Sequence, residues 1–203
     1  MPGDRDTPFA YESLSLLGKF SLRLSNKLVV SYLKPGSWLD ILSGYNGSLQ
    51  RSQVHNKSVT SFHSLDHSLN ADLNSLGFHL KELYLDDLLP YNDDTFDNIT
   101  IVNGLEHLWK PQDILSECYR VLREWGILQV IVPTWFGKPF LEFVAFRMNN
   151  EQAFREMNDH KTYYDERTLW PMLIKGGFQP KDVRILRVKL YCSLHAVAIK
   201  ATK

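Results

Sequence analysis

The segment Ser37-Trp-Leu-Asp-Ile41, followed by Leu42-Ser-Gly-Tyr-Asn-Gly47, decides the fold. Its first five residues predict a short buried strand, and the two glycines predict that this strand ends in a loop. Upstream, leucines at roughly helical spacing over residues 9–33 predict an N-terminal helix or a pair of helices. Lys34-Pro-Gly36 ends that segment, because the residue before a proline disfavours helix and glycine marks a turn.

Strands and helices alternate along the rest of the chain. This alternation predicts an α/β fold: a Rossmann-like, doubly wound, mostly parallel seven-stranded sheet with helices on both faces. We expect an N-terminal helical segment over residues 1–33 and one domain over residues 34–203. The remaining predicted strands are 58–63, 80–85, 98–103, 127–132, 183–189 and 195–200, and the predicted helices are 48–57, 111–126 and 168–175.

Composition narrows the class of protein. With 203 residues, 44% of them apolar and 23% charged, the chain is typical of a globular domain. The 23 basic and 23 acidic residues cancel, so no attraction to nucleic acid is predicted. No apolar run has the length of a membrane span or of a signal peptide. Cys118 and Cys192 form no CxxC pair, so we expect a cytoplasmic protein without disulfides.

The loop after the first strand is the first candidate for a binding site, because ligands of doubly wound sheets bind at the carboxyl ends of the strands. A dinucleotide-binding G-x-G-x-x-G pattern would fall on positions 42, 44 and 47. Only Gly44 and Gly47 are glycines, so the pattern is incomplete.

Several motifs follow this loop in a fixed order. They resemble those of the class I S-adenosylmethionine-dependent methyltransferases, in particular the methyltransferase type 11 group, over about residues 36 to 133. Residues 159–164 and Gly177-Phe178 extend the resemblance towards the C-terminus. The motifs are Asp40, Asp86-Asp-Leu-Leu-Pro90, Asp94-Thr-Phe-Asp97, Gly104-Leu-Glu-His-Leu108, Arg120-Val-Leu-Arg-Glu-Trp-Gly126 and Val130-Ile-Val-Pro133.

The resemblance implies an enzyme that transfers a methyl group from S-adenosylmethionine to a small acceptor or to a lipid- or glycan-linked one. It implies His107 as the candidate catalytic residue, acting as a base or a substrate contact, with a structural hydrogen bond as the alternative role. The implied cofactor residues are Asp40 beneath the loop; Ser43, Gly44, Tyr45 and Gly47, whose backbone N–H groups face the methionine carboxylate; Asp86, Asp87 and Leu88 at the adenine; and Asn103 beside the sulfonium.

Two departures predict a weakened cofactor site. Leu42 stands where the family has a glycine, and the aligned second strand ends at His63, where the family has an acid for the ribose hydroxyls. Asp66, three residues later, is the alternative ribose contact. A non-catalytic binding or assembly module of the same fold therefore stays open, whereas residues 104–108 argue against another type of nucleotide-binding protein. His55, His67 and His195 show no metal-ligand spacing, and no metal site is predicted.

Overall fold

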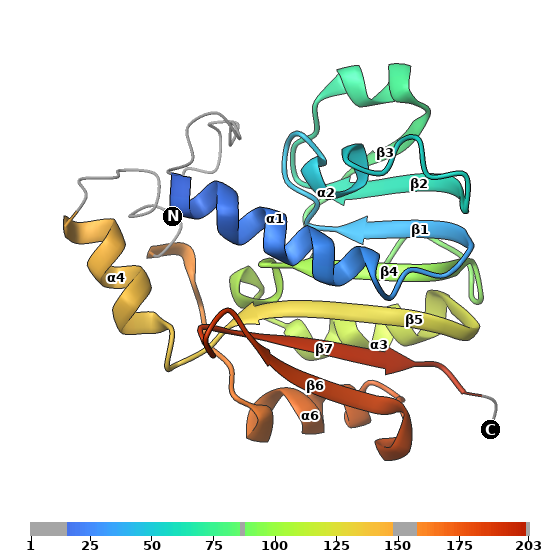
Figure 1. The fold of residues 1–203 in the computed structure, drawn as a ribbon. Coiled ribbons are helices and arrows are strands. Elements are labelled where there is room, and N and C mark those ends of the chain that lie inside the picture. Colours follow the sequence, from blue (N-terminus) through green and yellow to red (C-terminus); the bar gives the residue numbers. More distant parts are fainter. Residues whose placement is uncertain (1–15, 86–87, 148–157, 202–203) are drawn as a thin grey trace.

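The computed structural model describes residues 16–85, 88–147 and 158–201. Seven strands form one sheet in the order β3-β2-β1-β4-β5-β7-β6, which confirms the predicted fold class (Figure 1). Strand β7 runs antiparallel to both of its neighbours, and the other pairs are parallel. The strands are β1 (Gly36–Ile41), β2 (Val59–Asp66), β3 (Phe78–Glu82), β4 (Phe96–Val102), β5 (Leu122–Pro133), β6 (Val183–Val188) and β7 (Ser193–Ile199).

Helices cover both faces of the sheet. Helix α1 (Leu16–Val30) crosses one face, and α3 (Pro111–Val121) and α6 (Glu166–Lys175) lie on the other (Figure 1). No described helix combines the length and the apolar character that crossing a membrane requires. The shorter elements are α2 (Ser48–Arg51), η2 (Ala71–Leu76), η3 (Leu105–His107), α4 (Lys138–Arg147) and η4 (Pro180–Asp182).

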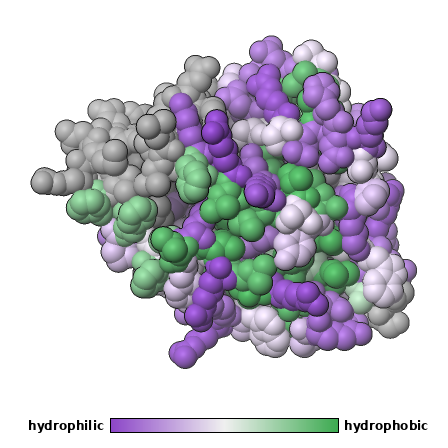
Figure 2. All heavy atoms as spheres, viewed as in Figure 1, coloured by the Kyte–Doolittle hydropathy of each residue, from purple (hydrophilic) through white to green (hydrophobic). Residues whose placement is uncertain are grey.

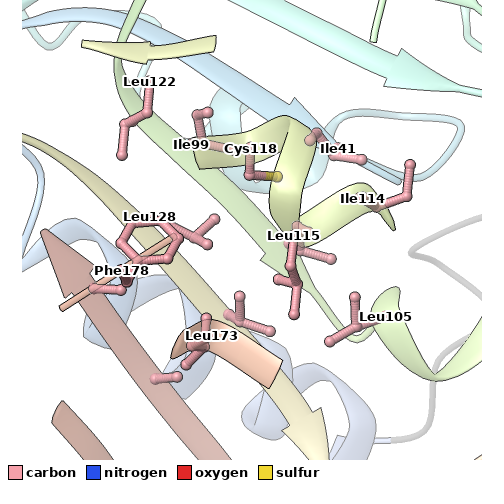
Figure 3. Packing of buried hydrophobic residues seen from close by; sticks show 14 of the residues in the cluster. Ile41, Ile99, Leu105, Ile114, Leu115, Cys118, Leu122, Leu128, Leu173 and Phe178 are labelled. Carbon is pink, nitrogen blue, oxygen red and sulfur yellow. The ribbon is translucent and has the colours of Figure 1, made fainter. Parts of the chain in front are cut away.

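The main core lies between the sheet and the helices α3 and α6. Leu115 and Cys118 of α3 and Leu173 of α6 are fully buried there against Ile99 and Leu128 of the sheet (Figure 3). This packing holds the carboxyl ends of β1, β4 and β5 in fixed relative positions.

Helix α1 is one continuous helix over its described length, running through Gly18 and Asn26 without a break. Val29 is fully buried against the sheet, and its carbonyl accepts a hydrogen bond of 3.1 Å from the Gln129 amide. His195 Nε2 donates in turn to Gln129 Oε1 at 3.0 Å. The C-terminal end of α1 is therefore anchored to β5 by a buried polar contact.

Several predicted boundaries were wrong. β2 continues to Asp66 rather than ending at His63, and β3 starts at Phe78 and ends at Glu82. The helix that begins at Pro111 ends at Val121 instead of Gly126, because Leu122 is already paired with Phe96 at the start of β5. Leu122 is fully buried, so its apolar side chain belongs to the sheet layer.

The turn between β6 and β7 has an unusual backbone. Lys189, Leu190 and Tyr191 have φ values of 53°, 55° and 67°, a left-handed conformation that costs a residue with a side chain about 1–2 kcal/mol. Thr134, directly after β5, fixes this turn: its hydroxyl donates to the Tyr191 carbonyl at 2.6 Å, and its N–H donates to the Cys192 carbonyl at 3.1 Å. The turn is thereby held at the carboxyl end of β5.

Candidate active site

The loops after β1, β2, β4 and β5 meet at the carboxyl edge of the parallel strands, on the left of Figure 1. Most of the described residues singled out in the sequence lie in these loops.

The loop after β1 offers space and a polar atom to a ligand. Gly44 has a φ of 73°, and a Cβ placed on it would meet no atom within 4 Å. Ser43 Oγ is buried and makes no hydrogen bond with any described residue. An open cradle beside an orphaned buried hydroxyl fits a bound polar group such as the methionine end of S-adenosylmethionine.

Two backbone N–H groups of this loop have partners within the protein, and their predicted contact with a cofactor stays a prediction. The Gly44 N–H donates to Asp66 Oδ2 at 2.8 Å, and the Gly47 N–H donates to the Gly44 carbonyl at 3.0 Å. The Tyr45 carbonyl accepts from the Asn70 N–H at 2.8 Å, which ties the loop to the segment after β2.

Asp66 ends β2 and is 5% exposed. Its carboxylate accepts from the Gly44 N–H and from the backbone and Nδ1 of His67, at 2.7 and 2.6 Å. The carboxyl end of β2 therefore carries an acid beside the loop after β1. The sequence alignment that ended this strand at His63 was wrong by three residues.

His63 lies in the middle of β2, opposite Leu39 of β1. Its ring stacks on His79 with 4.5 Å between centroids, and burial lowers its pKa to about 4. His63, His79, Lys81 and Tyr91 line a cavity of about 430 Å³ at the outer part of the sheet. This position separates His63 from the loops at the strand ends.

Asp40 lies beneath the loop, as the resemblance implied. Its carboxyl is 2% exposed and accepts from the Thr100 hydroxyl, which accepts in turn from Trp38 Nε1 at 2.9 Å. Burial raises the pKa of Asp40 to about 7, and the nearby Asp66 charge adds to that rise. The protein thus holds a carboxyl group that is half protonated near neutral pH.

Leu42 occupies the left-handed region, with a φ of 55°. Its half-buried side chain packs against the main core and lies beside Gly104, where a Cβ would come within 2.8 Å of Leu42 Cβ. The loop keeps a backbone shape that suits glycine, and the leucine side chain fills the gap between this loop and the one after β4.

We expect Leu42→Gly to be more stable than Leu42→Ala. Both variants lose the packing of a half-buried leucine, about 2 kcal/mol at the lower end of the scale for large-to-small changes. Only glycine relieves the left-handed strain of about 1–2 kcal/mol. Urea melts of both variants measure the difference.

Leu80, half-buried in the extended strand β3, is the matched control: there glycine should be the less stable replacement. A Leu42→Ala protein at least as stable as Leu42→Gly would contradict the strain.

The segment after β4 borders the same loop. Asn103 has a φ of 50°, and its N–H donates to the Ile131 carbonyl at 2.8 Å. The short helix η3 follows, with Glu106 buried and the Leu105 carbonyl accepting from the Tyr164 hydroxyl at 3.2 Å. Asn103 directly precedes Gly104, which lies beside Leu42, and its position beside a sulfonium stays a prediction.

Residues 159–161 bring a second polar group to this segment. The ring of His107 contacts Asp159 through Nδ1, 2.9 Å from Oδ2, and Lys161 Nζ donates to Asp159 Oδ1 at 2.7 Å. His160 lies against His107 with 4.9 Å between ring centroids. Ligand atoms of Glu106, His107 and His160 lie within 4.8 Å of one another. The sequence analysis missed this group because more than 50 residues separate His107 from His160.

Aromatic side chains surround the polar group. The rings of Trp135 and Tyr163 are 5.3 Å apart, and those of His160 and Tyr163 are 5.2 Å apart. Trp135 and Trp109 are 54% and 79% exposed. Hydrophobic side chains also gather over α4, on the left of the face drawn in Figure 2. This side of the carboxyl edge therefore suits a flat apolar molecule.

The predicted adenine contacts are described only in part. Asp86 and Asp87 lie outside the described residues, and Leu88 is 71% exposed.

Comparison with known proteins relates part of the chain to a family. Residues 48–130 match the family model described as "Methyltransferase domain". The matched segment is therefore similar to a methyltransferase domain. Over 122 residues the domain is 46% identical to the ubiquinone/menaquinone biosynthesis C-methyltransferase UbiE of Ruegeria sp., and 28% identical to UbiE of Roseobacter denitrificans. Each match covers 53% of this chain and 48% of the relative, so the chain spans about half the length of these curated relatives.

Solved structures share the fold of the methyltransferase domain. A possible histamine N-methyltransferase from Thermotoga maritima has a TM-score of 0.67 and 19% identity, and the match covers 94% of each chain. A Haloferax volcanii complex of the Trm112 methyltransferase activator with a methyltransferase gives a TM-score of 0.67 at 12% identity, covering 91% of this chain and 93% of the other. At these identities the likeness concerns the fold alone.

Proposed function

We propose that the chain transfers a methyl group from S-adenosylmethionine to a small aromatic acceptor of the quinone type. The observation that carries the proposal is the loop after β1, in which the open cradle at Gly44 and the buried Ser43 hydroxyl lie beside the Asp66 carboxylate. When bound, the cofactor supplies a methyl group already activated on a sulfonium. The chain's own residues have mainly to align donor and acceptor.

The residues in and beside this loop would each contact a different part of the cofactor. Asp66 ends β2 beside this loop and accepts a hydrogen bond from one ribose hydroxyl, since its two oxygens offer about four acceptor positions and the protein's own donors use three. Ser43 donates its hydroxyl to the methionine end, and Asn103 borders the reacting end. Binding of the adenine by Asp86, Asp87 and Leu88 stays a prediction.

The aromatic surroundings of His107 support a flat acceptor. Trp109, Trp135 and Tyr163 offer ring faces to an aromatic molecule, and the curated relatives are named as C-methyltransferases of ubiquinone and menaquinone biosynthesis. Of the small, lipid-linked and glycan-linked acceptors expected from the sequence, the proposal therefore takes a small one of the quinone type. Transfer to a ring carbon or oxygen releases one proton, and His107 lies on the side where the acceptor would lose it.

We expect S-adenosylhomocysteine to raise the melting temperature of the protein, and NAD to leave it unchanged. A ligand at about 100 times its Kd stabilises the native state by about 2.7 kcal/mol. For a chain of this size that corresponds to a shift of about 5–10 °C. Differential scanning calorimetry with the two ligands in parallel measures the effect. No shift with S-adenosylhomocysteine would contradict the proposal and favour the non-catalytic module.

Turnover separates an enzyme from a domain that only binds the cofactor. Incubation with S-adenosylmethionine and a reduced naphthoquinone that lacks a ring methyl group should give the methylated product, detected by mass spectrometry. A protein that binds S-adenosylhomocysteine but methylates neither this hydroquinone nor its oxidised form would disprove the acceptor class and leave the cofactor assignment intact.

A further inference from the structure

The polar group on the acceptor side has the composition of a metal site. Glu106 provides a buried carboxylate, and His107 and His160 provide two imidazoles, with the ligand atoms of all three within 4.8 Å of one another. Two imidazoles and one carboxylate are the protein ligands of catalytic zinc and of several other first-row divalent ions, which keep further positions open for a substrate. Among the described residues, this is the one group of three or more His, Cys, Asp or Glu side chains that meets such a geometry.

His160 supplies an independent observation. Its Nδ1 is buried and makes no hydrogen bond with any described residue. A buried ring nitrogen without a partner is costly unless something outside the protein satisfies it.

Asp159 completes the arrangement. It contacts His107 Nδ1 at 2.9 Å and is itself held by Lys161 Nζ at 2.7 Å. A carboxylate on one ring nitrogen fixes the orientation of a metal-binding histidine and makes the other nitrogen, here Nε2, a better ligand. Asp159 is therefore a positioning residue and Lys161 supports it.

We propose that Glu106, His107 and His160 bind one divalent transition-metal ion of the zinc class on the acceptor side of the domain. The role of the ion rests on the proposed function. The ion binds the oxygen of a phenolic acceptor, and the proton of that oxygen leaves to solvent. The acceptor then reacts as a metal-bound phenolate, because a bound cation favours the deprotonated oxygen. In this role His107 acts as a ligand rather than as a base.

The experiment is calorimetric titration of the purified full chain, first treated with a chelator, with zinc chloride in the absence of S-adenosylmethionine. We expect one equivalent of zinc to bind. Glu106→Gln and His160→Ala should each weaken binding at least ~10-fold because each removes one of three ligands. Asp159→Asn should weaken it by ~10–100-fold without changing the stoichiometry. Visible absorption of the cobalt-substituted protein should change in Glu106→Gln, which a merely structural role of the carboxylate would not produce.

His79→Ala is the matched control. His79 also lies against a second histidine ring, at 4.5 Å, but it is exposed and belongs to no such group with a carboxylate. Its replacement should leave zinc binding unchanged. Urea melts select the ligand variants that fold like the wild type, and Glu106→Gln, which nearly preserves side-chain size, covers the case in which His160→Ala does not fold.

Three results would overturn the inference: no stoichiometric zinc binding by the wild type, unchanged binding in a folded ligand variant, or loss of binding in His79→Ala. Thermal shifts with S-adenosylhomocysteine on the same proteins keep the two proposals apart. A protein that binds S-adenosylhomocysteine but no zinc refutes only the metal site, and a protein that binds zinc but no S-adenosylhomocysteine refutes only the cofactor assignment.

Discussion

Asp66→Ala should lower the affinity for S-adenosylhomocysteine by ~10-fold or more. A carboxylate that accepts from a ribose hydroxyl makes a charge-assisted hydrogen bond, which contributes about 1.5–3 kcal/mol. The same change removes the acceptor of the Gly44 N–H, which fixes the loop at 2.8 Å. The loss of the ribose contact and the loss of the bond to Gly44 both weaken cofactor binding. Together they should lower the affinity by more than the factor of ten that corresponds to about 1.4 kcal/mol.

Isothermal titration calorimetry measures this affinity. Asp72→Ala is the matched control, because Asp72 is an exposed acid in η2, close in sequence and outside the cofactor loop. His63→Asp tests the alternative alignment: with His63 in the middle of β2, the new acid should not tighten binding. Unchanged affinity in folded Asp66→Ala, or tighter binding by His63→Asp, would show that Asp66 is not the ribose acid.

Asp40 should make the wild-type protein lose stability as the pH rises from 5 to 8. In the folded state the Asp40 pKa is raised from 3.8 to about 7, so between these values the native state binds more protons than the unfolded chain. The free energy of unfolding therefore falls as the pH rises through this window. Between pH 5 and pH 8 this one group should remove about 2–3 kcal/mol.

The variant Asp40→Asn removes the titration while keeping the size of the side chain. Urea melts at pH 5 and pH 8 measure the free energy of unfolding. Between these pH values it should change by about 2–3 kcal/mol less in the variant than in the wild type, so the variant should be more stable relative to the wild type at pH 8 than at pH 5. Asp72→Asn, at an exposed acid, should behave like the wild type. An equal pH dependence in Asp40→Asn and wild type would mean that the Asp40 carboxyl titrates normally in the folded protein.

Much of the fold could be predicted because its strands are marked by local patterns. Residues 37–41 and 127–132 are short apolar runs next to glycines or prolines, and both form strands where predicted. Boundaries failed where a side chain has a tertiary role. Leu122 continues the apolar pattern of α3, yet it is paired with Phe96 in the sheet, a partner that the local sequence does not reveal.

The site could be predicted only where one segment carries it. The loop at 42–47 was found from its glycines, and Asp40 from its place in the first strand. The end of β2 was missed, although Leu65, directly before Asp66, is apolar and continues the buried side of the strand. The proximity of Glu106 and His107 to His160 depends on how the segments after β4 and β5 fold back, which spacing along the chain does not contain.

The anchor of α1 has a mechanical consequence. The Val29 carbonyl accepts from the Tyr32 N–H at the end of the helix and from the buried Gln129 amide, so a shift of the helix by one residue would break the bond to Gln129. The 15-residue helix then runs for about 22 Å as a stiff rod from this pivot. Its first turn reaches the side of the molecule on which β1 and β5 end (Figure 1). A small tilt of the helix about Val29 would therefore displace its first turn by a larger distance. That turn lies on the same side of the molecule as the loops after β1 and β5 (Figure 1).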